Sequence, residues 1–405
     1  MKKTISTLAL VSLFTATTAF ASGYRIPEQS VDSTAKAGAN VASASRADAA
    51  YFNPANMSWL SNGWQAQVNA SWIHLTAVSY EDYRSPFFSG ESEEENFLVP
   101  TGFVVSPYYG DFRFGLAITA PDGLAKNWRD PYPRAVSQKI SLEVIDINPT
   151  ASYKFNDMVS VAVGPRMLYN KAEFQADARY VGQPAAIDME GDTVEWGWNA
   201  ALSVKPNEQL NLSATYRSNV DLDFEGDVDI FYGRALPTID GALTVPAPAV
   251  LTLAAAFDVT EALNVELSWD RTFWSEYESL DFDFSPTLGI PAFEAPRPKN
   301  WDDSSAYRIG VSYKLNDIWT LLGGFAYDES PAPDETLSFE LPDSDAYLFS
   351  AGTQYKVNEQ MELGLGVLYD LKEEREVTIN PLGTVYGEFT DSAAWLVTVG
   401  LNYKF

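Results

Sequence analysis

The sequence offers few of the side chains that usually carry out chemistry. It has one histidine, His74, and no cysteine. Hydrolysis at neutral pH usually needs a histidine base, and zinc sites need clusters of histidine and cysteine. His74 stands on the apolar side of an alternating segment, near its end, which is typical of a residue at a membrane interface. We therefore expect no enzymatic activity, no metal site and no cofactor.

Arginine is the other residue type that could do chemistry here, because its planar guanidinium can pair with a carboxylate through two parallel hydrogen bonds. Arg166, Arg217 and Arg308 each stand on the polar side of an alternating segment. They are candidate contacts for an acidic ligand. The alternative, and the more common situation, is that they pair with acids of the protein itself. The acids predicted on the same side are Asp221, Asp223, Glu266 and Asp270.

Alternation of apolar and polar residues defines the elements that must position these arginines. In the last segment, the odd positions from Ala393 to Phe405 are apolar, with aromatic residues toward both ends, and the even positions are mostly polar or small. Side chains two apart on a strand share a face. A soluble β-sandwich alternates too, but aromatic residues at both ends of an apolar face about ten residues long are typical of strands that face lipid.

Fourteen such segments are predicted, joined by connections that alternate between short and long. No stretch after residue 21 approaches the roughly 18 apolar residues of a membrane helix. In lipid every backbone polar group needs a partner, so the strands must close on themselves. The sequence thus predicts an all-β fold, a 14-stranded antiparallel transmembrane β-barrel. The expected strands are 64–76, 97–108, 111–120, 139–155, 158–175, 193–205, 209–225, 247–259, 262–278, 304–315, 317–329, 344–357, 360–373 and 391–405.

Both ends of the chain carry targeting features. Residues 1–21 are predicted to be a cleaved signal peptide, with Lys2 and Lys3 before a short apolar stretch and Ala19-Phe20-Ala21 as the cleavage site. Phe405, with apolar residues at alternating positions before it, predicts recognition by the barrel-assembly machinery. We expect a protein of the Gram-negative outer membrane. Its parts would be the signal peptide (1–21), a plug or hatch (22–60) and the barrel (61–405).

The formal net charge of −28 excludes nucleic acid as a partner, because such a surface repels polyanions. Solvated acidic loops account for this charge most simply. The alternative is that acidic loop clusters, such as Glu93, Glu94 and Glu95, hold divalent cations that bridge lipopolysaccharide. Outer-membrane lipid and lipopolysaccharide are the expected surroundings, and we expect a monomer.

Residues 22–60 differ from the rest, because they contain nine alanines and no strand alternation. A short helix is predicted from Ser43 to Ala50. A fourteen-stranded barrel lies between filled eight-stranded barrels and open sixteen-stranded porins, so its lumen admits water unless a segment occupies it. We predict that residues 22–60 form a small, partly α-helical plug in the lumen. A disordered periplasmic tail is the alternative.

The chain resembles the FadL/TodX family of outer-membrane transporters for long-chain fatty acids and other hydrophobic molecules. The resemblance lies in Ser22-Gly23-Tyr24, in Asn53-Pro54-Ala55 ahead of fourteen strands, in Thr215-Tyr216-Arg217-Ser218 and in 306–333. It implies that Asn53, Pro54 and Ala55 form the hatch motif and that Ser22, Gly23 and Tyr24 line the ligand path.

The same resemblance implies an outer groove among the loops, an inner site near the N-terminus and a lateral exit where the third strand kinks inward. Here the third strand is predicted at 111–120. Gly110 or Gly115 is the predicted position of the kink, because glycine often marks a bend in a strand.

The resemblance also bears on the ligand. Lys171 lies near the place where the family has a ligand-contacting base, so it joins the candidate carboxylate contacts. The family's second basic contact is replaced here by Ser304 or its neighbours, which leaves room for an uncharged ligand. The residues predicted to line an apolar path, or alternatively to pack against the hatch, are Leu168, Trp274, Leu322 and Leu396.

The predicted function is passive uptake of long-chain fatty acids or similar hydrophobic molecules across the outer membrane. Capture at the extracellular loops would be followed by transfer to a site near the N-terminus and exit through the barrel wall. One alternative is uptake of toluene-like aromatic hydrocarbons by a member of the same family. A general diffusion porin is a further alternative, and it predicts an open lumen without a hatch.

Overall fold

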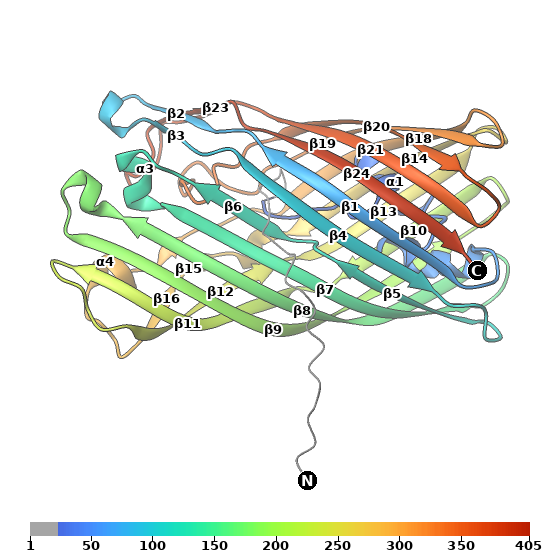
Figure 1. Ribbon diagram of the computed structural model, residues 1–405, viewed down its shortest axis with the longest axis horizontal. Helices are drawn as coiled ribbons and strands as arrows, with labels where there is room; N and C mark the ends of the chain where they lie inside the picture. The colour runs from blue at the N-terminus through green and yellow to red at the C-terminus, as the bar shows by residue number, and fades with distance from the viewer. Residues whose placement is uncertain (1–22) are drawn as a thin grey trace, which may run out of the picture.

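A closed barrel forms nearly the whole chain. The computed structural model describes residues 23–405, so the predicted signal peptide and Ser22 lie outside the described residues. Eighteen strand pieces form one sheet, which closes where β1 (Gln65–Leu75) pairs with β24 (Ala393–Lys404). Four strands consist of two consecutive pieces, so the wall has fourteen antiparallel strands, which confirms the predicted architecture (Figure 1).

The strands of the wall follow one another around the barrel in chain order. The other single-piece strands are β4 (Glu95–Val105), β7 (Lys139–Lys154), β8 (Val159–Asp177), β9 (Ala185–Val204), β18 (Ser304–Lys314), β19 (Trp319–Asp328), β20 (Ala346–Lys356) and β21 (Met361–Lys372). The two-piece strands are β5 (Phe112–Thr119) with β6 (Gly123–Asn127), β10 (Leu210–Arg217) with β11 (Val220–Tyr232), β12 (Ile239–Ala247) with β13 (Ala249–Asp258), and β14 (Leu263–Phe273) with β16 (Phe282–Ser285).

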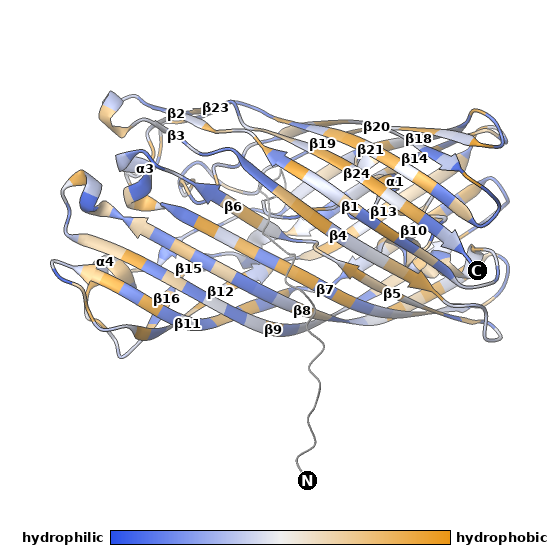
Figure 2. Cartoon of the chain, in the orientation of Figure 1, coloured by the Kyte–Doolittle hydropathy of each residue, from blue (hydrophilic) through white to orange (hydrophobic). Residues whose placement is uncertain are grey.

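Alternation along each strand sorts side chains between the lumen and the outer surface. On β1, Gln65, Gln67 and Asn69 are buried, whereas Val68 and Trp72 are exposed on the outer face. Because lipid surrounds the outer face, this arrangement places apolar side chains against lipid and polar ones inside. Figure 2 shows the resulting alternation of hydrophobic and hydrophilic residues along the strands.

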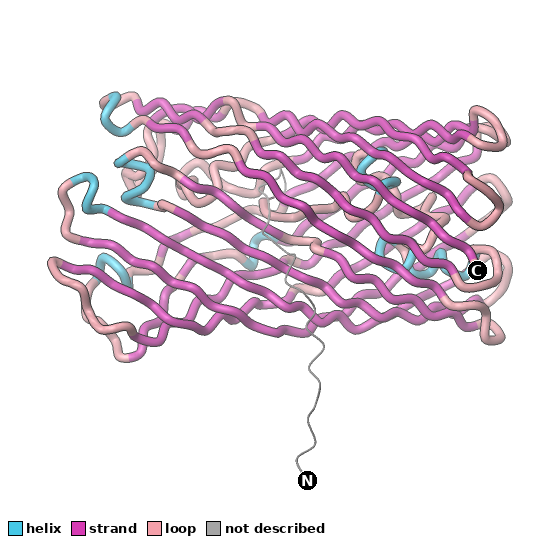
Figure 3. The backbone as a smooth tube through the Cα atoms, viewed as in Figure 1, coloured by secondary structure: helices cyan, strands magenta, loops and turns pink. Residues whose placement is uncertain are grey.

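The two ends of the barrel differ. Short turns and the C-terminus lie at one end, and long loops gather at the other (Figure 3). The loops carry two small sheets, in which β2 (Ser79–Asp82), β3 (Gly90–Glu91), β22 (Arg375–Val377) and β23 (Gly387–Thr390) form one and β15 (Ser279–Leu280) and β17 (Arg297–Pro298) the other. They also carry the short helices η2 (Pro86–Phe88), α3 (Pro131–Val136), η3 (Ala178–Val181), η4 (Trp274–Glu276) and α4 (Pro291–Glu294). Within the described residues, every helix is too short or too polar to cross a membrane.

Residues 23–60 lie inside the lumen, where almost all of them are buried. We call this segment the hatch. It contains α1 (Val31–Ala35), α2 (Ala49–Phe52) and η1 (Pro54–Trp59). The predicted helix from Ser43 to Ala50 is therefore wrong in its bounds. The short helix α1 was not predicted. Its N-cap is Ser30, whose side chain accepts a hydrogen bond from the backbone of Ser33.

A break in the seventh strand changes which side chains face the lumen. Arg217, at the end of β10, lies on the lumenal side, as predicted. The two residues between β10 and β11 shift the alternation by one, so Asp221 and Asp223 are exposed on the outer face and their predicted lumenal position is wrong. Glu266 and Asp270 on β14 are buried in the lumen, as predicted.

Candidate functional site

The third strand of the wall is interrupted at residues 120–122. β5 pairs with β7 up to Thr119 opposite Asp146, and β6 resumes at Gly123 opposite Glu143. Three residues of the third strand therefore face two of β7. Pro121 stands in the interruption, and proline has no N–H group to donate to a ladder.

The predicted position of the kink at Gly110 or Gly115 is wrong. Gly110 lies in the turn before β5 with a φ of 65°, which glycine adopts without strain. Gly115 is regularly paired with Val105 and Thr150. A Cβ atom at Gly115 would lie 2.5 Å from the sulfur of Met57, so this glycine lets the hatch approach the wall. Pro121 was the signal in the sequence that could have located the interruption.

The hatch supplies hydrogen bonds that the interrupted strand lacks. The side-chain amide of Gln29 donates to the carbonyl of Ala120 and accepts from its N–H, both at 2.8 Å. The N–H of Ile26 donates to the carbonyl of Pro121, and the N–H of Gly123 donates to the carbonyl of Tyr24, both at 2.7 Å. Residues 24–29 therefore take the place of a neighbouring strand at this point.

The interruption leaves a stretch without strand pairing between β4 and β6, and we call such a gap in the ladder a lapse. β4 pairs with β5 only from Gly102 to Val105. Among the described residues, no strand ladder joins 95–101 of β4 to β6. Thr101 of β4 instead donates a hydrogen bond of 2.8 Å to the carbonyl of Gln29. The hatch thus bridges both sides of this lapse.

An apolar cavity of about 50 Å³ lies next to the interruption, in the part of the lumen toward the long loops. Tyr24 of the hatch and Leu124 of β6 both border it. This volume holds only a few water molecules, so a longer molecule enters only when lining side chains move. The lining residues are Tyr24, Leu124, Ile140, Ser141, Leu142, Ala172, Glu173, Phe174, Met189, Gly191, Phe224, Leu243, Val245, Tyr277 and Leu280.

Aromatic side chains enclose the first described residues of the chain. The ring of Tyr24 lies 4.7 Å from that of Trp274 and 5.9 Å from that of Trp301, measured between centroids. A Cβ atom at Gly23 would lie 2.6 Å from Trp274 and 2.7 Å from Trp301, so only glycine fits there. Trp274 is thus brought beside the predicted ligand path at Gly23 and Tyr24.

The other residues predicted to line an apolar path have different surroundings. Leu168 is fully buried in the same apolar cluster as Tyr24, although it does not border the cavity. Leu396 is packed in a cluster with Ile26 of the hatch. Leu322 faces a polar vestibule at the short-turn end of the barrel. The structure therefore brings only Leu168 and Trp274 close to Tyr24.

A folded loop covers the lumen at the end opposite the short turns. In the loop between β19 and β20, Phe339 is fully buried, and its carbonyl accepts a hydrogen bond of 2.9 Å from Trp128. In the same loop, Glu340 pairs with Arg297 at 3.5 Å and with Lys299 at 3.6 Å. Burial acts to raise the pKa of Glu340, but Lys299 and Arg297 outweigh it and hold this pKa below its ordinary value. We call residues 329–345 the cap.

The three predicted lumenal arginines are already paired with acids. Arg166 and Arg217 share Asp146, at 2.8 Å and 3.2 Å. Arg308 contacts Asp270 at 3.2 Å and Asp328 at 3.0 Å, and it donates to the carbonyl of Ala37 in the hatch at 3.0 Å. The structure therefore shows the alternative arrangement, in which these arginines pair with acids of the protein itself.

Lys171 does not face the lumen. It is exposed on the outer face of β8, because Leu168 and Asn170, on the even positions of this strand, are the ones that point inward. Its prediction as a lumenal contact followed the resemblance rather than the alternation of the strand. On the same outer face, His74 is half-exposed and stacks on Trp72 with ring centroids 5.6 Å apart.

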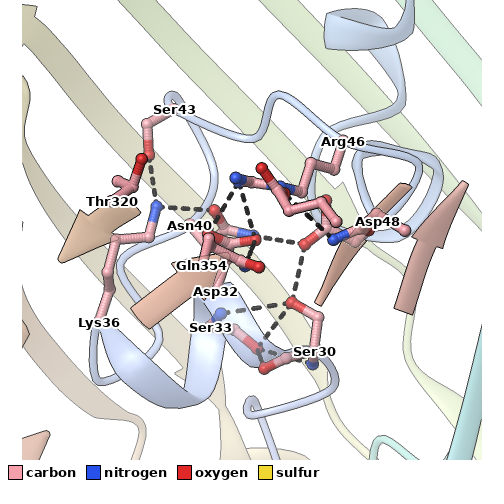
Figure 4. Close-up of polar contacts among 12 residues, drawn as sticks. Ser30, Asp32, Ser33, Lys36, Asn40, Ser43, Arg46, Asp48, Thr320 and Gln354 are labelled. Atoms are coloured by element: carbon pink, nitrogen blue, oxygen red, sulfur yellow. Dashed lines mark hydrogen bonds and ion pairs between the residues drawn. The ribbon is translucent and has the colours of Figure 1, made fainter. Parts of the chain in front are cut away.

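A dense polar network holds the hatch in the part of the lumen toward the short turns (Figure 4). Arg46 pairs with Asp32 of α1 at 3.0 Å and with Glu362 of β21 at 2.5 Å. Asp48 accepts hydrogen bonds from Ser30 at 2.7 Å and Asn40 at 2.9 Å. Arg46 thus links α1 to a strand of the wall, and buried charge pairs of this kind are costly to separate, so this part of the hatch is fixed to the wall.

Glu266 of β14 makes a second connection to the hatch. Its carboxylate accepts hydrogen bonds from the consecutive N–H groups of Val41, Ala42 and Ser43, at 2.7, 3.1 and 2.7 Å. Hydrogen bonds to an ionised acceptor are about twice as strong as neutral ones.

The Asn53-Pro54-Ala55 motif joins α2 to η1. The side-chain oxygen of Asn53 caps η1 by accepting from the N–H of Ala55 at 3.2 Å, and its amide donates to Ser213 of β10 at 2.8 Å. Pro54 occupies the first turn of η1, where a missing N–H costs nothing. Ala55 is buried against Ala162 and Ala201 of the wall.

Comparison with known proteins gives consistent results. Residues 12–405 match the model of a family described as outer membrane protein transport protein (OMPP1/FadL/TodX). A long-chain fatty acid transport protein of Escherichia coli (strain K12) is 26% identical over 366 residues, which cover 78% of this chain and 80% of that protein. Outer membrane protein P1 of Haemophilus influenzae is 24% identical over 467 residues, covering 99% of each chain.

Two solved structures share the fold. A FadL homologue of Pseudomonas aeruginosa superposes with a TM-score of 0.83 at 20% identity, covering 95% of this chain and all of that one. The toluene transporter TodX of P. putida gives a TM-score of 0.73 at 18% identity, covering 93% of this chain and 98% of that one.

Proposed function

Because the chain belongs to the OMPP1/FadL/TodX family of outer membrane transport proteins, we propose that it takes up long-chain fatty acids or similar hydrophobic molecules. It is a protein of the outer membrane. The match to relatives named long-chain fatty acid transport protein extends over about four-fifths of the length of each relative. The family is one of transporters, so transport rather than catalysis is the activity to test.

The observation that carries this proposal is the coincidence of three features at one place. The wall lapses between β4 and β6, the apolar cavity borders the strand that follows the interruption, and Tyr24 belongs both to the cavity and to the bridge across the lapse. A ligand in the cavity therefore lies beside an opening that residues 24–29 of the hatch bridge.

The physical advantage of a lateral route is that the ligand stays on apolar surface. Moving a methylene group into water costs about 0.8 kcal/mol, so a long acyl chain cannot cheaply cross the polar vestibule at the short-turn end. We propose that molecules enter beneath the cap, occupy the cavity at Tyr24 and leave through the wall between β4 and β6. No energy source is needed if the product is consumed inside the cell.

An aromatic hydrocarbon is the second candidate ligand. The three lumenal arginines are all occupied by protein carboxylates, which favours an uncharged molecule at their level of the lumen. The solved relatives that are named toluene transporters share the fold of this chain. The general diffusion porin is not proposed, because the described hatch and cap occupy the lumen.

Straightening the third strand tests the lateral route. Deleting Ala120 and replacing Pro121 with Val leaves two residues opposite two of β7, so the ladder can continue. We expect uptake of radiolabelled oleate and toluene, in cells without another such transporter, to fall to the level of cells lacking the protein. Pro248→Val, at the break between β12 and β13, is the matched control and retains uptake. Normal uptake by a folded, straightened barrel would exclude this exit.

A further inference from the structure

One lumenal cation differs from all those described above. Lys126 of β6 is buried, with only 3% of its surface exposed. It pairs in register with Ile140 of β7, directly above the pair formed by Leu124 and Leu142. Because residues two apart on a strand share a face, Lys126 points to the lumen, as Leu124 does.

Lys126 has no acid close enough to neutralise it. Its amine donates one hydrogen bond, to Ser92 Oγ at 3.4 Å, and within residues 23–405 no carboxylate oxygen lies within 4.0 Å of it. Glu95 at the end of β4 attracts the ammonium from farther away, whereas Lys372 repels it. A buried ammonium without a counterion is costly, so its surroundings favour an added anion.

A second ammonium group faces the same space. Lys126 and Lys372 both line a cavity of about 10 Å³ beneath the cap, which is room for about one water molecule. Asp343 of the cap pairs with Lys372. Two ammonium groups, of Lys126 and Lys372, and one carboxylate, of Asp343, therefore lie in this region. The other walls of the cavity are mainly apolar, including Leu75, Val78 and Leu341.

Two consecutive lumenal residues of β6 border this small cavity and the apolar cavity at Tyr24. Leu124 borders the apolar cavity, and Lys126, the next lumenal residue on the strand, borders the other. Neighbouring positions on one face of a strand are separated by roughly 7 Å, a distance that an amphiphile spans easily. A linear molecule can thus place its tail in one cavity and its head group in the other.

We propose that Lys126 binds the carboxylate head group of an acyl ligand whose chain occupies the apolar cavity. The ligand class assigned by this site is a long-chain monocarboxylate rather than a neutral hydrocarbon. This inference rests on the proposed function and names its substrate. The lysine acts as a point charge with three donors, one of which Ser92 already orients.

The test compares palmitate with hexadecanol, which differ only in the head group. Binding is measured in lipid nanodiscs, without detergent that would compete, for the wild-type protein, Lys126→Met and Lys171→Met. We expect Lys126→Met to weaken palmitate binding by about tenfold to a hundredfold and to leave hexadecanol binding unchanged. Lys171→Met, on the outer face, is the matched control for loss of a positive charge and retains both affinities.

Equal affinities of the wild type and Lys126→Met for palmitate would overturn the proposal, and so would an equal loss for both ligands. If Lys126→Met does not fold, Lys126→Arg and Lys126→Gln replace it. Retained palmitate preference in the first and its loss in the second support the head-group role, and any other result contradicts it. A wild-type protein that binds neither ligand, nor toluene, would instead refute the proposed function.

Discussion

Two of the places where the described barrel wall lacks a strand ladder are closed in different ways. Between β9 and β11 the ladder lapses over 193–198 and 218–224. There the wall closes itself, because Ser218 exchanges hydrogen bonds with the backbone of Trp198 at 2.9 and 3.0 Å and Val220 packs against Gly197. Between β4 and β6 the groups that bridge the lapse beside the interruption belong to the hatch, and the segment before β4 contacts β6 only farther along, from Glu93 to Asn127.

This difference explains why, of these two lapses, the one between β4 and β6 is the candidate exit. Groups of the wall cannot leave without unfolding a strand, whereas residues 24–29 can shift while every barrel strand remains paired. The element that closes the second lapse also borders the apolar cavity through Tyr24. Filling the cavity can therefore act on the bridge. Phe224, at the end of the β9–β11 lapse, also lines the cavity, but it belongs to the wall itself.

Deleting residues 22–60 should have the largest effect, because it removes the hatch from only one of the two lapses. The β4–β6 lapse and the lumen would lose their hatch, while the β9–β11 lapse would keep its own side chains. We expect a folded barrel that passes small hydrophilic solutes, measured by swelling of reconstituted liposomes, with the intact protein as the control. A truncated barrel that stays sealed would show that the hatch does not plug the lumen.

Glu266→Ala should loosen the hatch without removing it. The N–H groups of Val41, Ala42 and Ser43 would lose a charged acceptor, and each bond to a charged group contributes about 1.5–3 kcal/mol. We expect hydrogen exchange of these three amides to accelerate by at least about tenfold. Glu208→Gln, in an exposed turn, is the control. Unchanged protection would mean that Glu266 does not anchor the hatch.

A pair of single substitutions sharpens the contrast between the two lapses. Gln29→Ala leaves the N–H and carbonyl of Ala120 without partners, at a cost of about 1–3 kcal/mol for each group. Ser218→Ala removes one side-chain bridge from the β9–β11 lapse. Both should accelerate local amide exchange, but only Gln29→Ala should change the rate of oleate uptake. Equal effects on uptake would remove the distinction between the lapses.

The smallest expected effect concerns the cap and pH. The pKa of Glu340 is held below its ordinary value, so its pairing with Arg297 and Lys299 contributes stability at higher pH and is lost as the pH falls through the lowered pKa. We expect protease cleavage within 329–345 to increase on acidification. In Glu340→Gln cleavage should be raised at all pH values and nearly independent of pH. A wild-type profile without pH dependence would contradict this role.

Alternation in the sequence was sufficient to predict the wall, because each strand that faces lipid on one side and the lumen on the other must repeat with a period of two. It placed His74 outside and Arg166 and Arg308 inside. It failed where a strand breaks. Asp221 and Asp223 lie beyond the break after β10, where the phase of the alternation changes.

The candidate site was less predictable, since it depends on contacts between segments far apart in the chain. Pro121 ended the predicted third strand, so β6 and Lys126 were assigned to a loop. Lys171 was misplaced because the resemblance outweighed the parity of its own strand. Nothing local to Gln29 indicates that its amide closes a lapse 91 residues away.

The seam between β1 and β24 also orders the assembly of the barrel. These strands meet in register from Gln65 opposite Lys404 to Leu75 opposite Ala394, although they are the first and last wall strands in the chain. The hatch joins β1 directly, through 61–64. Every other wall strand has therefore been synthesised before the barrel can close around the hatch.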